Sequence, residues 1–248
     1  MKIFAQKLLV GRTFLANQTV TVEDGQITAI GGGGPADFSV WALTPGLVDL
    51  HCHGGQGFDP ELNERPLPEF LTILLCHGVT DVLLTLGAEP LPTMRRALAV
   101  VQTAMQQQAA GKLPGAHILG VHLEGPFLSP ERPGAMPPAA LLPPTLAAYQ
   151  TLVQGYESVI RQVTLAPELP GALELGAALA ARGIRVQAGH TDADYETAQR
   201  AFSAGFTGLC HTFNACRPLR HRSAPPPIPF PPQKKNLPPS PEEDSSLP

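Results

Sequence analysis

The sequence has little charge and no strong excess of either sign. Only 15% of its 248 residues are charged, and the formal net charge at pH 7 is −4. Nucleic acids and anionic membrane surfaces attract proteins through clusters of basic residues. A composition this close to neutral gives no such attraction. We therefore expect neither a nucleic-acid partner nor a membrane partner.

Signals for export, membrane insertion and disulfide bonding are also lacking. No apolar run approaches the ~18 residues of a membrane-spanning helix. The apolar N-terminal segment contains Lys7 and is not followed by a small-residue cleavage pattern. The four cysteines lie in core-like or motif-like segments without framework spacing: Cys52, Cys76, Cys210 and Cys216. These absences favour a cytoplasmic protein with reduced thiols.

Proline is abundant, and it is concentrated at the C-terminus. The chain has 28 prolines, of which 11 lie in the last 31 residues, Pro218 to Pro248. Such a segment buries too little apolar surface to offset the entropy of ordering. We therefore predict a disordered or extended tail over residues 218–248.

Short strands are predicted at the N-terminus. The segments 18–23 and 26–30 flank Asp24-Gly25, a strong signal for a two-residue hairpin turn. Residues 31–34 are all glycine and release the chain from this hairpin. The pattern predicts a small β unit over residues 1–43.

From residue 44 onward, apolar strand-like runs alternate with amphipathic helical patterns. The predicted strands are 44–51, 79–86, 116–123, 160–166, 184–189 and 206–211. The predicted helices are 67–77, 91–110, 144–158, 171–182 and 193–204. This alternation indicates an α/β fold with parallel strands and right-handed crossovers.

The order of elements suits a (β/α)₈ barrel, in which functional groups gather at the carboxyl ends of the strands. An open doubly wound sheet is the alternative, but no Gly-x-Gly-x-x-Gly turn follows the first strand of the alternating pattern. A barrel needs eight strands, and six are predicted before the proline-rich tail. We therefore expect an incomplete TIM barrel over residues 44–217.

A pair of histidines ends the first strand of this region. Side chains two residues apart in a strand share a face, so His51 and His53 project together. Two such imidazoles can chelate one divalent metal ion. They could equally be polar residues that merely finish a strand.

Three later motifs strengthen the metal interpretation. Glu124, His190 and His211 each stand where an apolar, strand-like run stops. Because the carboxyl ends of barrel strands meet, we expect these side chains to converge. A mixed carboxylate and imidazole set suits zinc or iron(II), with one position left open for water.

Neighbouring polar residues have simpler interpretations. His122 shares a strand face with Glu124, so it could reach the cavity or pack inside the sheet. Cys52 should point to the face opposite the two histidines, as a packed thiol. Thr191 and Asp194 resemble a capping box at the start of a helix.

The motifs resemble those of the N-acetylglucosamine-6-phosphate deacetylases, a family of the amidohydrolase superfamily. The matching segments are Pro-Gly-Leu-Val-Asp-Leu-His-Cys-His-Gly at 45–54, His-Leu-Glu-Gly-Pro-Phe at 122–127, Thr-Leu-Ala-Pro-Glu at 164–168, Gly-His-Thr at 189–191, and the run 211–222. The resemblance covers roughly residues 1–222. It implies a metal-dependent amidohydrolase barrel with a small N-terminal β-sandwich portion.

The resemblance also implies a metal centre and a reaction. Glu124, His190 and His211 would be the principal metal ligands, while His51 and His53 would serve a second metal position or support the first. One or two zinc or iron(II) ions would activate water and polarise the acetamide of N-acetylglucosamine 6-phosphate. The products would be glucosamine 6-phosphate and acetate, and the family is usually homo-oligomeric.

Substrate contacts follow from the resemblance residue by residue. Asn214 and Ala215 match positions that hold the sugar phosphate, and Arg222 matches a phosphate-binding arginine. Ala135 matches a loop that lines the sugar site, although the family commonly has Lys-Gly-Ala-His where this chain has Pro-Gly-Ala-Met at 133–136. A D-aminoacylase is a weaker alternative, since it leaves the Asn-Ala and His-Leu-Glu-Gly-Pro matches unexplained together.

The catalytic aspartate of the family has no counterpart in these 248 residues. The family pattern stops near Ser223, where a proline-rich segment replaces an Arg-Glu-Pro-Gly-like continuation. Truncation or a reading-frame change near that codon would produce this pattern, which resequencing the gene would test. The alternative to an active deacetylase is therefore an impaired remnant that binds metal without turnover.

Overall fold

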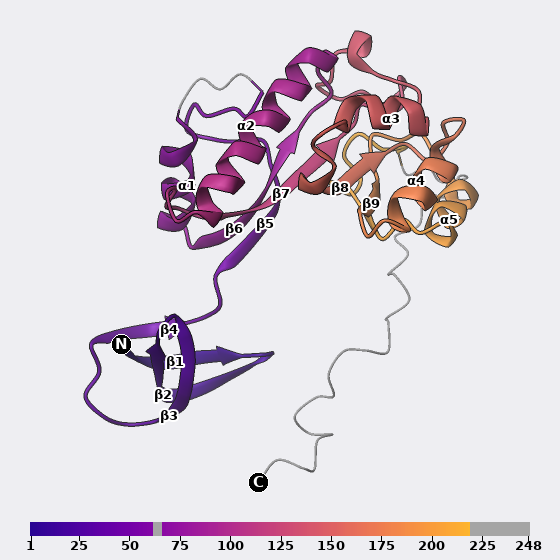
Figure 1. Cartoon of the computed structure of the whole chain (residues 1–248). Coiled ribbons are helices and arrows are strands. Elements are labelled where there is room, and N and C mark those ends of the chain that lie inside the picture. Colours follow the sequence, from indigo (N-terminus) through magenta and orange to yellow (C-terminus); the bar gives the residue numbers. More distant parts are fainter. Residues whose placement is uncertain (62–65, 219–248) are drawn as a thin grey trace. The chain divides into compact units, whose positions relative to one another are not determined.

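A computed structural model describes residues 1–61 and 66–218. Contacts within the chain divide it into two compact units, Met1–Leu47 and a second unit that begins at Val48. Figure 1 shows both units in the colours of the sequence. The predicted tail beyond Pro218 and the candidate phosphate ligand Arg222 lie outside the described residues.

The N-terminal unit is one mixed four-stranded sheet in the order β3-β2-β1-β4. Its strands are β1 (Lys2–Val10), β2 (Thr13–Glu23), β3 (Gln26–Gly32) and β4 (Phe38–Leu43). Strand β1 is antiparallel to β2 and parallel to β4. The predicted hairpin is confirmed, because β2 and β3 pair antiparallel around Asp24 and Gly25, whose φ angles of 50° and 75° suit a type I′ turn.

The second unit carries six strands and five α-helices among its described residues. The strands are β5 (Leu47–Cys52), β6 (Val79–Leu86), β7 (His117–Glu124), β8 (Ile160–Leu165), β9 (Arg185–Ala188) and β10 (Gly208–Leu209). The helices are α1 (Leu67–Cys76), α2 (Leu91–Ala109), α3 (Leu146–Val153), α4 (Ala172–Ala180) and α5 (Tyr195–Ser203). Short 3₁₀ turns span Pro138–Ala140 and Glu157–Val159.

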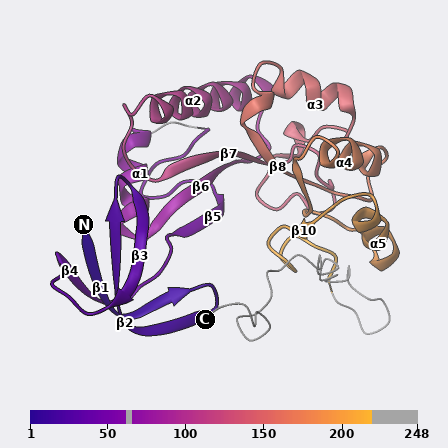
Figure 2. The ribbon, with the colours of Figure 1, turned by 60° about the horizontal axis from the view of Figure 1, so that its bottom comes forward.

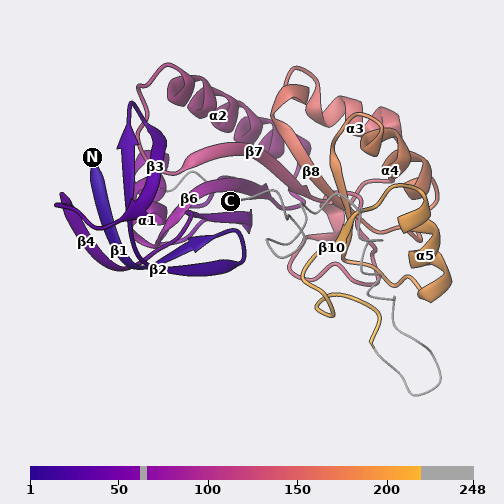
Figure 3. The ribbon, with the colours of Figure 1, turned by 90° about the horizontal axis from the view of Figure 1, so that it is seen from below.

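The six strands form one sheet in sequence order, from β5 to β10. Strands β6 to β10 pair in parallel, each with the next. Helices α2, α3, α4 and α5 follow one side of the curved sheet, as Figures 2 and 3 show. Among the described residues, β5 and β10 remain the two edges. The predicted fold class, an incomplete (β/α)₈ barrel that follows a small N-terminal β portion in the sequence, is confirmed.

Two predicted elements are shorter than expected. Helix α3 ends at Val153 rather than near 158, because Gly155 has φ +85° and the chain turns there before a 3₁₀ segment. The last strand was predicted over 206–211, but only Gly208 and Leu209 have strand geometry. His211 has φ 28°, outside the extended region, so the strand cannot continue to residue 211 as predicted.

The core of the second unit fills the layer between sheet and helices. Helix α2 buries Met94, Leu98 and Val101 against the sheet, on the helical stripe that the sequence predicts. Strand β6 is buried over its last five residues. A parallel strand covered in this way holds its carboxyl end in a fixed place. The side chains that follow these strands are therefore positioned by the core.

Candidate metal centre

The end of β5 places the two histidines together. The Nε2 atoms of His51 and His53 lie 3.1 Å apart, so both rings face the same side of the strand as predicted. Their strand is anchored to β6 because the backbone N–H of Cys52 donates to Thr85 Oγ1 at 2.9 Å. The thiol of Cys52 packs against the hydrophobic core.

Glu124 ends β7 and lies at the middle of the site. Its side chain is only 2% exposed, yet both carboxylate oxygens have short polar contacts. Oε1 lies 3.2 Å from His190 Nε2 and 2.8 Å from His211 Nε2. Oε2 lies 2.7 Å from His53 Nε2 and 3.3 Å from His51 Nε2. The structure therefore brings together all five side chains that the sequence singled out.

Backbone carbonyls fix the orientation of two of these rings. His190 Nδ1 lies 3.0 Å from the carbonyl oxygen of Arg132, and His211 Nδ1 lies 3.0 Å from that of Asn214. A carbonyl oxygen only accepts, so each Nδ1 must carry the proton and donate. In the neutral imidazoles, both Nε2 atoms then have a lone pair and no hydrogen.

These lone pairs converge on the carboxylate. The Nε2 atoms of His190 and His211 are 2.9 Å apart, and both lie within 3.2 Å of Glu124 Oε1. Three acceptors this close repel one another unless a cation sits among them. A proton bridges only two such atoms, whereas a metal ion joins all three. Histidines that donate their second nitrogen to a carbonyl are typical metal ligands.

The pKa shifts of the residues in the site also indicate that positive charge is favoured beside Glu124. Burial alone would raise the pKa of Glu124, but contacts with the imidazoles of His190, His211, His51 and His53 outweigh burial and hold its pKa far below the usual range. Contacts with Cys210, and then with Glu124, raise the pKa of His211 to about 11 and that of His51 to about 9.

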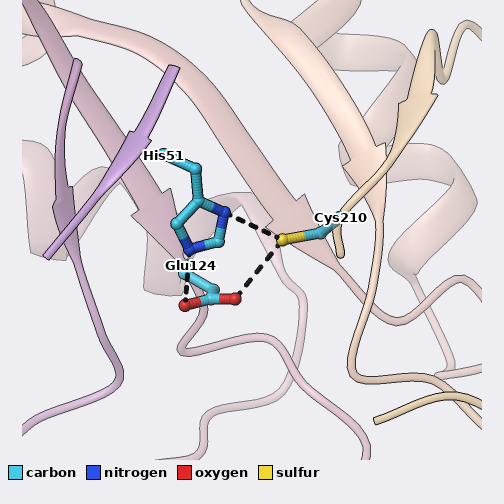
Figure 4. A group of neighbouring side chains, drawn as sticks. All are labelled: His51, Glu124 and Cys210. Carbon is cyan, nitrogen blue, oxygen red and sulfur yellow. Dashed lines mark hydrogen bonds and ion pairs between the residues drawn. The ribbon is translucent and has the colours of Figure 1, made fainter. Parts of the chain in front are cut away.

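Cys210 is part of the site, although the sequence did not single it out as a ligand. Its thiol lies 3.3 Å from Glu124 Oε1 and 3.4 Å from His51 Nδ1, as Figure 4 shows. Strand alternation would turn Cys210 and His211 to opposite faces. Because the strand stops at Leu209, both side chains reach Glu124. Only the direct adjacency of the cysteine to His211 signals this in the sequence.

His122 lies beneath these ligands rather than among them. It is fully buried, and its ring nitrogens lie 3.3 Å from Thr85 Oγ1 and 2.8 Å from Thr164 Oγ1. Burial, followed by the nearby charge of His51, lowers the pKa of His122 to about 3. Of the two predicted alternatives for His122, packing inside the sheet is therefore the one that the structure shows. Its neutral ring lies edge-on to the ring of His51, with 4.9 Å between the centroids.

The loop after His190 corrects one sequence prediction. Asp194 alone caps helix α5, because its carboxylate accepts from the backbone N–H of Thr197 at 2.8 Å. The hydroxyl of Thr191 instead donates to Glu168, which also accepts from the backbone N–H of Asp192. The predicted capping box is therefore wrong, and the threonine ties the loop that follows His190 to the end of β8.

A cavity of about 550 Å³ opens over the candidate ligands. Ala135, Asn214 and Ala215, the described residues with a predicted substrate role, all line it. Glu61 lines it too, and no signal in the sequence pointed to this residue because it lies in a loop. Its Oε1 accepts from the backbone N–H of Gly87 at 2.5 Å, and burial, followed by a hydrogen bond with Asp59, raises its pKa to about 8.

A comparison with known protein families shows which family the chain belongs to. The model of the amidohydrolase family matches residues 42–217. The chain belongs to the amidohydrolase family. The matched segment contains every strand end that contributes to the site described above.

This amidohydrolase is similar to two curated bacterial deacetylases. The N-acetylglucosamine-6-phosphate deacetylase of Vibrio furnissii is 34% identical over 231 residues, which are 88% of this chain and 56% of that protein. The N-acetylgalactosamine-6-phosphate deacetylase of Escherichia coli O157:H7 is 35% identical over 227 residues, which are 88% of this chain and 58% of that protein. The chain thus spans a little over half the length of these relatives.

A solved structure agrees with the amidohydrolase fold. A mutant N-acetyl-D-glucosamine-6-phosphate deacetylase from Mycobacterium smegmatis, in complex with N-acetyl-D-glucosamine 6-phosphate, superposes with a TM-score of 0.80 at 32% identity. The match covers 91% of this chain and 59% of that one. The resemblance predicted from the motifs is confirmed.

The described residues contain no helix long and apolar enough to cross a bilayer.

Proposed function

We propose that this amidohydrolase holds a divalent metal ion at Glu124, His190 and His211 and hydrolyses the acetamide of N-acetylglucosamine 6-phosphate. One observation carries the proposal. Two imidazoles whose Nδ1 atoms are fixed by backbone carbonyls aim their Nε2 lone pairs at one buried carboxylate oxygen. The donor set of nitrogen and oxygen fits zinc or iron(II).

A metal ion in this position would activate water and polarise the acetamide carbonyl. The chain's own residues do the positioning. Glu124 offers Oε1 to His190 and His211 and Oε2 to His51 and His53, so these residues would hold one or two ions. Paired metal ions in hydrolases lie about 3.5–4 Å apart. Replacing both His51 and His53 by alanine should lower the metal stoichiometry and leave the first position filled.

The substrate follows from the cavity and from the relatives. Ala135, Asn214 and Ala215 line the space over the ligands, where a phosphorylated amino sugar would present its acetamide. Two deacetylases of epimeric N-acetylhexosamine 6-phosphates are similarly close in sequence, so both epimers belong in the assay. A cytoplasmic setting suits the four free cysteines, and homo-oligomers are proposed from the resemblance.

The test is an acetate-release assay on the 248-residue chain loaded with zinc or, anaerobically, with iron(II). We expect slow, metal-dependent turnover, because no residue here matches the family aspartate and general acid–base groups typically contribute ~10²–10⁴-fold. Glu124→Gln should abolish this turnover. Acetate release at the same rate in Glu124→Gln or without metal would contradict the proposal. Metal binding without any acetate release would reduce the function to that of a metal-binding remnant.

A further inference from the structure

Cys210 stands at the metal centre without an assigned role. It is 1% exposed, and its Sγ lies 3.3 Å from Glu124 Oε1 and 3.4 Å from His51 Nδ1. The three side chains come from the end of β5, the end of β7 and the residue after β10. Figure 4 shows these three side chains pointing toward one another.

The spacing of these atoms matches that of ligands around one ion. Zinc binds sulfur at about 2.3 Å and nitrogen or oxygen at about 2.0–2.2 Å, which places tetrahedral neighbours roughly 3.3–3.7 Å apart. The three side chains offer ligand atoms that all lie within 4.8 Å of one another. A thiol has one proton, so it can donate to either Glu124 or His51 but not to both. A deprotonated sulfur, a carboxylate oxygen and the unprotonated Nδ1 of a neutral imidazole each have a lone pair that one cation could share.

We propose that Cys210 is a thiolate ligand of the metal centre and forms a second cation position with His51 and Glu124. The inference rests on the proposed function in that the centre must bind a divalent metal. Binding replaces the S–H bond by a metal–sulfur bond, and the released proton leaves through the cavity to solvent. The thiolate adds a second negative charge to that of Glu124, which helps to balance two divalent ions.

The second cation position could be formed with Cys210 or with His53, and the ring of His51 distinguishes these two arrangements. Its Nδ1 faces Cys210, whereas its Nε2 faces His53 Nε2 and Glu124 Oε2. These nitrogens lie on different sides of the ring and cannot bind one ion together. The His53 side chain is 43% exposed, while Cys210 is buried. A buried ligand is held by its packing and excludes competing water, so the cysteine version is favoured.

The experiment is a cobalt(II) titration of the full 248-residue chain, followed by its absorption spectrum. A thiolate bound to cobalt(II) gives a near-ultraviolet charge-transfer band that imidazole and carboxylate ligands do not give. We expect this band in the unmodified protein and its loss in Cys210→Ser, with cobalt stoichiometry falling from two to one. Cys216→Ser, which changes another buried thiol, and His53→Ala should both keep the band.

A further variant makes the test independent of how well Cys210→Ser folds. Replacing Cys52, Cys76 and Cys216 together by serine leaves Cys210 as the single thiol, and the band should persist. Cobalt uptake without the band in the unmodified protein overturns the role of Cys210 and leaves the proposed function standing. The absence of the band from the triple variant, or its loss in His53→Ala, also overturns the role of Cys210. No cobalt uptake at all refutes the proposed function itself.

Discussion

At the scale of single residues, the metal centre depends on two histidines in unusual backbone conformations. His190 and His211 have φ angles of 46° and 28°, outside the regions that L-residues prefer. Each such residue costs of order 1–3 kcal/mol and persists only where its surroundings hold it. Here the ring of each histidine is held by a backbone carbonyl on one side and by Glu124 on the other.

Gly134 supports the ring of His190 by leaving room for it. A Cβ at this position would lie 2.8 Å from His190 Cε1. We expect Gly134→Ala to tilt the ring and weaken zinc binding about 10–100-fold, the usual cost of disturbing a ligand's support. Gly111→Ala is the matched control, because its φ of 68° resembles the 60° of Gly134 but nothing lies within 4 Å. Equal zinc affinities of the two variants, measured by competition with a chelator, would contradict this account.

Glu61 should make stability depend on pH. Burial raises its pKa from 4.5 to about 8, so between these values the folded state holds a proton that the unfolded state has lost. The free energy of unfolding should therefore fall as pH rises from about 4.5 to about 8. Glu61→Gln keeps an acceptor for Gly87 and should flatten this part of the profile. Urea denaturation at several pH values measures it, and identical slopes in both proteins would rule the effect out.

Sequence periodicity predicted some of these residues and missed others. His51 and His53 were predictable because a period of two puts both on one face. Cys210 was not, because alternation fails where the last strand stops early. Glu61 was missed because a loop residue has no period from which its direction could be inferred. Arg222 stays a prediction, since it lies outside the described residues.

At the scale of elements, the carboxyl ends of β5, β7 and β9 and the segment after β10 position the ligands. The positions of the strands were predictable to within a few residues, because their apolar runs are bounded by glycine, proline and polar residues. The ends of α3 and β10 were not, since they depend on the conformations of Gly155 and His211. The capping box failed for a similar reason, because the hydroxyl of Thr191 has a partner from another element, Glu168.

Helix α5 follows His190 directly, and its cap can be tested alone. Asp194 accepts from the backbone N–H of Thr197. Asp194→Ala should lower the free energy of unfolding by about 1 kcal/mol, the usual cost of losing such a cap. Asp194→Asn keeps a capping oxygen and should cost far less. If both variants have the same midpoint in urea, the cap contributes nothing and the helix is held by packing alone.

At the scale of the whole chain, the second unit is a curved sheet whose described edges are β5 and β10. An edge strand presents unpaired backbone groups and can recruit other chains. Val48 lies on β5 with half of its side chain exposed. Val48→Lys should reduce concentration-dependent light scattering, whereas Leu75→Lys on helix α1 should not. Equal scattering by all three proteins would exclude β5 as the site of association.

The order of the strands was predictable from the alternation of strands and helices, and the convergence of the ligands followed from it. The atomic contacts could not be predicted from the sequence. The lone-pair arrangement around Glu124 depends on which carbonyls meet His190 and His211, and these belong to Arg132 and Asn214. Neither contact has a sequence signal, because Arg132 lies in a distant loop and Asn214 in an irregular turn.

The central claim is that Glu124, His190 and His211 hold a divalent metal ion. The direct measurement is equilibrium dialysis of the 248-residue chain against zinc, with metal content determined by mass spectrometry. The account predicts at least one ion per chain in the unmodified protein. In His190→Ala/His211→Ala, the ion at this position should be lost while the far-ultraviolet circular dichroism spectrum is kept. An unchanged zinc stoichiometry in the folded double variant would contradict it.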